Sequence, residues 1–158
     1  MEFNFIWLTS LINQPSLFQN LAQKAYLLTD SCQNYPNYDK WYWGKEIPRI
    51  VNGTGEIILC LNRNQVVGIA FLKKDLQEKK LCTFYVVENY RKKYISVKLL
   101  NLAFNYLGTT TPLISISEHK LPMFRHIISK YNWELTQILS DSYYGNSFRE
   151  FVYNGKLI

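Results

Sequence analysis

The chain has 158 residues, of which 47% are hydrophobic and 19% are charged. This composition excludes a disordered chain, and the length fits one domain that buries a core without disulfides or metals. Eighteen basic residues against twelve acidic ones give a net charge of +6. Such a charge favours an anionic partner, either a phosphorylated cofactor or a nucleic acid such as RNA. It is equally consistent with a charge that only keeps the protein in solution.

The three cysteines, Cys32, Cys60 and Cys82, are odd in number and lack paired spacing. They predict neither a disulfide framework nor a metal site. The N-terminal segment lacks the basic stretch of a signal peptide, and no apolar run approaches the length of a membrane span. We therefore expect a cytoplasmic protein, monomer or homodimer, without a membrane partner.

Strands are predicted where apolar and polar residues alternate or β-branched residues cluster, and helices where apolar residues form a one-sided stripe. Pro48 is expected to bend or end the second helix. In chain order the sequence predicts a strand over 2–8, helices over 15–30 and 40–50, strands over 56–61, 65–73 and 81–88, a helix over 95–107, a strand over 112–117, a helix from Leu121, and strands over 134–141 and 147–153.

The helix over 95–107 is the most informative element. Apart from Ser96 and a narrow stripe of three polar residues, its circumference is apolar, as expected of a helix packed across a sheet. The strands over 81–88 and 112–117 should then be parallel neighbours with a right-handed connection. The predicted fold class is α/β (α+β), one domain with a mixed sheet, in which an antiparallel meander precedes a parallel βαβ crossover and helices cover both faces.

Residues 86–96 read VVENYRKKYIS. Here the sequence resembles the GCN5-related N-acetyltransferase (GNAT) family, whose signature is a strand ending in Val-x-Pro-x-Tyr-Arg and a Gly-x-Gly-x-Gly segment that opens a helix. Val86, Tyr90 and Arg91 match the signature, and Ile95 takes its usual apolar position. The resemblance in element order covers nearly the whole chain, whereas the motif match covers this short segment.

The resemblance implies acetyl-CoA as cosubstrate, with its pyrophosphate at the helix N-terminus, where N–H groups and the helix dipole attract anions. Lys92 or Lys93, depending on the register, stands at the first glycine of the signature, and Tyr94 stands at the central one. The Tyr94 side chain must therefore point away from the phosphates. The implied cofactor-binding residues are Val86, Val87, Arg91, Lys92, Lys93, Tyr94, Ile95 and Ser96.

The resemblance also implies a backbone N–H, from Val86 or Val87, that donates to the thioester carbonyl. A general acid is needed for the leaving thiolate, and the family often supplies it as a tyrosine at the position that Ile128 occupies here. Tyr143 and Tyr144, in the predicted closing turn, are the alternative acids, although either residue also suits a packing role.

A base is needed for the attacking ammonium. Glu118 and His119 follow the strand over 112–117, at a rim that faces the active cleft in such sheets. His119 titrates near neutrality, and its alternative reading is an exposed loop histidine. Glu88 stands at the position where the family often has proline. It is a further candidate for the base or for a contact with the acceptor.

Aromatic residues concentrate before and within the second predicted helix. In the resembled fold this region forms one wall of the acceptor pocket, where rings hold an amine, an aromatic substrate or a nucleobase. The alternative is that they anchor a short helix to the sheet, and we expect some of each. The group comprises Tyr35, Tyr38, Trp41, Tyr42 and Trp43.

These residues together predict an acetyl-CoA-dependent N-acyltransferase that moves an acetyl group directly to a primary amine of a small molecule or macromolecule. One alternative is a catalytically degenerate relative that keeps the fold as a binding or regulatory module, as the tyrosine at position 94 suggests. Another is a toxin-type acetyltransferase acting on aminoacyl-tRNA, which the positive charge allows.

Overall fold

The computed structural model describes residues 2–31, 36–91, 94–140 and 148–157. The predicted element order is confirmed. The elements are β1 (Phe3–Trp7), η1 (Leu8–Leu11), α1 (Pro15–Asp30), α2 (Tyr38–Trp41), η2 (Tyr42–Glu46), α3 (Ile47–Asn52), β2 (Gly55–Asn62), β3 (Gln65–Lys74), β4 (Lys79–Val86), η3 (Glu88–Tyr90), α4 (Ile95–Leu107), β5 (Ile114–Ser117), η4 (Glu118–Lys120), α5 (Leu121–Lys130), β6 (Leu135–Leu139) and β7 (Glu150–Tyr153).

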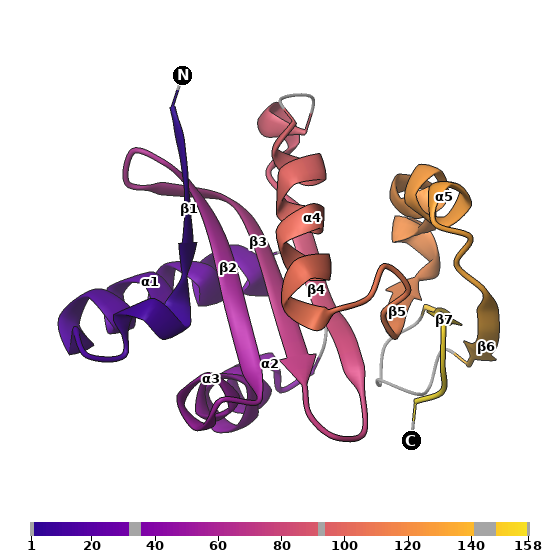
Figure 1. Ribbon diagram of the computed structural model, residues 1–158, viewed down its shortest axis with the longest axis horizontal. Helices are drawn as coiled ribbons and strands as arrows, with labels where there is room; N and C mark the ends of the chain where they lie inside the picture. The colour runs from indigo at the N-terminus through magenta and orange to yellow at the C-terminus, as the bar shows by residue number, and fades with distance from the viewer. Residues whose placement is uncertain (1, 32–35, 92–93, 141–147, 158) are drawn as a thin grey trace.

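The strands form two sheets, one of β1 to β4 and one of β5 to β7 (Figure 1). The first has the order β1-β2-β3-β4 and is antiparallel throughout, and the second has the order β5-β7-β6. A parallel bridge between Lys80 and Leu113 joins β4 to the start of β5. The Leu81 N–H donates to the Leu113 carbonyl at 2.9 Å, and the Leu113 N–H donates to the Lys79 carbonyl at 2.9 Å.

The predicted parallel pairing of 81–88 with 112–117 is therefore correct at its beginning and wrong beyond it, because the strands separate after the bridge. A β-bulge contributes to the separation: Leu81 pairs with Leu72 and Thr83 with Phe71, so Cys82 is an extra residue in β4. Such a bulge bends the strand and increases its twist.

Helices cover both faces of the larger sheet, as predicted. One core cluster lies beneath α4 and α5, and the other lies beneath α1, α2 and α3. Gly68 in β3 allows α4 to approach, because a Cβ there would lie 3.1 Å from Ile95 Cγ2 and 3.3 Å from Cys60 Cβ. None of the helices in the described part of the chain is long and apolar enough to cross a membrane.

The second predicted helix is one helical segment over residues 38–52 with a π-helical turn, η2, between α2 and α3. The Ile47 N–H donates to the Tyr42 carbonyl, five residues back. Pro48 explains this wider turn, since it has no N–H and its ring crowds the carbonyl four residues earlier. Pro48 therefore widens the helix locally, and the segment runs two residues beyond the predicted Ile50.

Candidate functional site

The separation of β4 from β5 leaves a cavity of about 50 Å³ between the two strands. Phe84 and Phe124 border it, with ring centroids 6.3 Å apart in an edge-to-face contact. The cavity begins just beyond the Lys80–Leu113 bridge. Its lining residues are Leu81, Cys82, Thr83, Phe84, Ile114, Ser115, Ile116, Ser117, Lys120 and Phe124.

Backbone direction distinguishes the two valines that the resemblance singles out. The Val87 N–H donates to the Val67 carbonyl of β3 at 2.9 Å, so it is engaged within the larger sheet. Because successive N–H groups of a strand point to opposite sides, the Val86 N–H points toward the gap beside β5. Of the two predicted donors, Val86 therefore directs its N–H away from β3, toward the side of β4 where β5 lies, and Val87 does not.

Helix α4 begins directly after Tyr94, at the end where β4 and β5 are apart. Tyr94 has φ 62° and ψ 3°, a left-handed conformation that glycine adopts more readily. Tyr94 is 83% exposed, so its ring points to solvent. Among the residues that the structure describes, no side chain caps this end of α4, and the first helical bond runs from the Lys98 N–H to the Tyr94 carbonyl. The N–H groups of residues 95–97 thus have no capping side chain from the described part of the chain.

Arg91 lies beside this helix end. Its Nε donates to the Val86 carbonyl at 2.8 Å, and its guanidinium carbon lies 5.5 Å from the Tyr85 ring centroid. These two contacts hold a positive charge at the end of β4. Tyr90 packs edge-to-face on Phe3. The predicted Lys92 and Lys93 lie outside the described residues.

The two predicted catalytic side chains that the structure describes, Glu118 and His119, lie together in η4. Arg149 donates to the Glu118 carboxylate through its backbone N–H, Nε and Nη2, at 3.1–3.2 Å. The backbone hydrogen bond from Arg149, followed by its side chain, lowers the pKa of Glu118, which weakens Glu118 as a base. His119 is exposed and packs on Phe148, with ring centroids 4.3 Å apart. Tyr143 and Tyr144 lie outside the described residues.

A second cavity, of about 260 Å³, lies on the α2 and α3 side of the sheet. It shares Cys82, Thr83 and Ser115 with the gap between β4 and β5. Neighbouring strand residues usually face opposite sides, so the bulge explains why both Cys82 and Thr83 line this cavity. We call it the α3 pocket. Its lining residues are Pro36, Tyr38, Trp41, Arg49, Lys73, Glu78, Lys80, Cys82, Thr83 and Ser115.

Glu46 lies behind the α3 pocket with its side chain fully buried. Neither carboxylate oxygen has a hydrogen-bond partner among the residues that the structure describes. Burial raises the pKa of Glu46 to about 7, against the opposing attraction of Arg49, Lys80 and Lys73. All three of these cations line the pocket. A buried carboxyl with such a pKa exchanges a proton near neutral pH.

The sequence analysis missed Glu46, although the sequence contained a signal. Tyr38, Tyr42, Glu46 and Ile50 recur every four residues, the spacing of one helix face. Tyr38, Tyr42 and Ile50 are buried. A charged residue on an otherwise apolar stripe is the pattern that would have identified it.

The described aromatic residues of this helical segment include some that line the α3 pocket and some that anchor the segment. Tyr38 and Trp41 line the α3 pocket. The Tyr42 hydroxyl donates to the Ala22 carbonyl at 2.6 Å, and the Tyr38 hydroxyl donates to Thr29 Oγ1 at 2.6 Å. Both tyrosines therefore tie the segment to α1. Trp43 packs edge-to-face on Tyr42, and Tyr35 lies outside the described residues.

Solved structures share this fold. The ribosomal-protein-S18-alanine N-acetyltransferase from Escherichia coli aligns over 96% of this chain and 92% of its own, with TM-score 0.70 and 11% identity. A GNAT-family protein from Desulfovibrio desulfuricans aligns over 96% and 97%, with TM-score 0.67 and 11% identity. The chain has the GNAT fold.

A further GNAT-fold relative is a GNAT family acetyltransferase from Elizabethkingia anophelis with acetyl-CoA bound. It covers 69% of this chain and 80% of its own, with TM-score 0.50 and 18% identity. No protein-family model matches the sequence, and no curated protein matches it. At these identities the likeness establishes the fold, and function has to be argued from the site.

Proposed function

We propose that the chain is an acetyl-CoA-dependent N-acyltransferase that moves an acetyl group directly to a primary amine. The observation that carries the proposal is the parting of β4 from β5 after the parallel bridge, with the N-terminus of α4, which no described side chain caps, at the open end. That arrangement offers a backbone-lined slot for an extended thiol arm and an anion site at its mouth.

The residues present fit acetyl-CoA. The N–H groups of residues 95–97 and the charge of Arg91 suit a pyrophosphate, and the exposed Tyr94 ring leaves that side of the helix end open. The Val86 N–H suits the thioester oxygen, where it would stabilise developing negative charge. Acetyl-CoA would supply the thioester carbon that the amine attacks. The relative from Elizabethkingia anophelis, which has acetyl-CoA bound, supports this choice of cosubstrate.

A direct transfer forms the bond from nitrogen to the carbonyl carbon and breaks the bond from that carbon to sulfur. The amine loses one proton, and the thiolate gains one. The α3 pocket suits the amine because it reaches the gap through Cys82, Thr83 and Ser115. Transfer then proceeds across the β4–β5 gap, with cosubstrate and acceptor entering from different sides.

A binding protein without catalytic activity is the second candidate. The observation that favours it is that Glu118 is engaged by Arg149 and that Ile128 packs against the core at the position where the family often has its acid. Such a protein would still bind acetyl-CoA and would differ only in turnover. Release of free thiol in the presence of amines separates the two candidates.

Calorimetric titration with acetyl-CoA tests the cofactor site. Ser96→Glu adds a carboxylate in the first turn of α4, which suits the helix dipole but repels a pyrophosphate. We expect it to lower the affinity about tenfold or more while the protein stays folded. Asn105→Glu adds the same charge about 13 Å along the helix, beyond the screening length at physiological salt, and should leave the affinity unchanged. Equal affinity in both variants, or no binding by the wild type, would contradict the proposal.

A further inference from the structure

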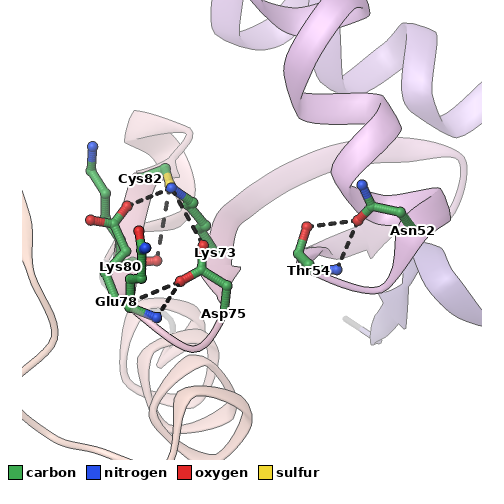
Figure 2. Close-up of polar contacts among 8 residues, drawn as sticks. Asn52, Thr54, Lys73, Asp75, Glu78, Lys80 and Cys82 are labelled. Carbon is green, nitrogen blue, oxygen red and sulfur yellow. Dashed lines mark hydrogen bonds and ion pairs between the residues drawn. The ribbon is translucent and has the colours of Figure 1, made fainter.

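The α3 pocket and the gap between β4 and β5 share three residues, Cys82, Thr83 and Ser115. An amine that enters through the pocket and attacks a thioester in the gap passes these residues. Burial raises the pKa of the Cys82 thiol to about 12, and its Sγ donates to the Lys80 carbonyl at 4.0 Å (Figure 2). The thiol therefore keeps its proton at neutral pH. Ser115 differs, because its hydroxyl donates to Glu150 Oε2 at 3.0 Å.

Strand pairing places Glu150 beside Ser115. β5 and β7 are antiparallel with Ser115 opposite Val152, so Glu150, two residues before Val152, is a diagonal neighbour of Ser115. On either side of Ser115 in β5, Ile114 and Ile116 belong to the core beneath α4 and α5. Because side chains alternate along a strand, Ser115 points to the opposite face of the small sheet, on the side of the α3 pocket that it lines.

The two residues differ in their access to a ligand. Glu150 is fully buried and lines neither cavity, whereas Ser115 is half-buried and lines both. A ligand in either cavity therefore reaches the carboxylate through the Ser115 hydroxyl. A hydroxyl is both a donor and an acceptor, so Ser115 can take a proton from a ligand while it passes its own proton to Glu150. A carboxylate removed from water is stabilised by gaining that proton.

The other carboxylates near the acceptor's route are paired or out of reach. Among the described lining residues of the two cavities, the one carboxylate is that of Glu78, and Lys73 Nζ lies 2.7 Å from its Oε1 (Figure 2). The predicted base Glu118 accepts hydrogen bonds from Arg149. Glu46 is fully buried and lines neither cavity. The Ser115 hydroxyl thus connects the acceptor's route to a carboxylate that no lysine or arginine of the described chain pairs with.

We propose that Ser115 and Glu150 form a proton relay that deprotonates the attacking ammonium. The ammonium gives one proton to Ser115 Oγ while the Ser115 hydroxyl proton passes to Glu150, which leaves a neutral amine and a protonated carboxyl. The nitrogen then bonds to the thioester carbon, the bond from that carbon to sulfur breaks, and the second proton of the nitrogen goes to the thiolate. Glu150 returns its proton to water through Ser115. The relay rests on the proposed acetyl transfer, and Glu150 acts in it through Ser115.

The walls of the α3 pocket suggest acceptors that isolate this step. Tyr38 and Trp41 line it with ring centroids 5.6 Å apart, and an aromatic body packed on these rings leaves the amine free to reach the shared residues. Phenethylamine and O-benzylhydroxylamine both carry such a body, and they differ by one CH₂ replaced by oxygen. At neutral pH the first is an ammonium and the second is a neutral nucleophile, so the first needs the relay and the second does not.

Thiol release from acetyl-CoA with these two acceptors tests the relay. Glu150→Gln and Ser115→Ala should each lower kcat with phenethylamine about 100-fold or more, while KM and the rate with O-benzylhydroxylamine stay within about threefold of the wild type. The double variant should lose no more than either single variant, because the two residues act as a unit. Glu134→Gln, which changes an exposed carboxylate just before β6, should match the wild type with both acceptors.

The rate with O-benzylhydroxylamine also reports on folding. An equal loss with both acceptors would assign Glu150 a structural role and overturn the relay, as would an unchanged kcat with phenethylamine. Acetyl-CoA binding to the wild type, measured on the same preparation, separates this proposal from the proposed function. If the wild type binds acetyl-CoA but releases no thiol with either acceptor, the transfer and the relay both fail. If it acetylates both acceptors and the variants lose both activities equally, the transfer stands and the relay alone fails.

Discussion

The ionisation of Glu46 predicts a measurable loss of stability as the pH rises from 4.5 to about 7. The carboxyl is fully buried with no hydrogen-bond partner in the described part of the chain, and burial raises its pKa from an ordinary 4.5 to about 7. Each pH unit of this interval corresponds to 1.36 kcal/mol. Keeping Glu46 charged therefore costs the folded state about 3 kcal/mol above pH 7.

The sign follows from proton linkage. Between pH 4.5 and about 7 the folded protein holds a proton on Glu46 that the unfolded chain releases, so the free energy of unfolding falls as the pH rises. Glu46→Gln removes this dependence, because the amide resembles the protonated carboxyl and does not ionise. The variant should match the wild type near pH 4.5 and exceed it by about 3 kcal/mol at pH 8.

Urea unfolding at a series of pH values measures this difference. Glu78→Gln is the matched control, since Glu78 is half-buried and paired with Lys73, and such pairs contribute about 1 kcal/mol or less. A constant difference between Glu46→Gln and the wild type from pH 4.5 to pH 8 would refute the reasoning. It would mean that Glu46 has a partner or reaches water.

Two further predictions concern α4. Tyr94→Gly should raise the free energy of unfolding by up to about 1 kcal/mol, because glycine relieves the left-handed strain and loses part of that gain to backbone entropy. Urea unfolding checks it, with Asn105→Gly inside the helix as a destabilising control, and a loss of stability in Tyr94→Gly would contradict the strain. Gly68→Ala should cost about 1–3 kcal/mol, because the new Cβ presses on Ile95 and Cys60. Gly44→Ala, where a Cβ meets nothing within 4 Å, is its control, and equal stability of the two variants would disprove the close packing.

The sequence predicted a helix or strand well where residues within that element determine where it begins and ends. Helix α4 has the predicted bounds, because its apolar stripe is long and Gly108 ends it with φ 74°. The Arg91 Nε donates to the carbonyl of Val86, the other signature residue, at 2.8 Å. In each case the determining contacts lie within a few residues along the chain.

The separation of β4 from β5 could not be predicted in this way. It depends on a bulge at Cys82, whose position is set by pairing with β3, and it is accompanied by a ring contact between Phe84 and Phe124 of α5. Glu46 was missed although its spacing from Tyr42 and Ile50 places it on the buried face of its helical segment. Its raised pKa depends on burial and on interaction with Arg49 and with residues of the sheet, which the local pattern does not show.

A crystal structure with acetyl-CoA tests the central claim most directly. The account predicts pyrophosphate density at the N–H groups of residues 95–97, the thiol arm between β4 and β5, and the thioester oxygen within hydrogen-bonding distance of the Val86 N–H. Density for acetyl-CoA elsewhere on the protein, with β4 and β5 still parted and empty between them, would contradict it.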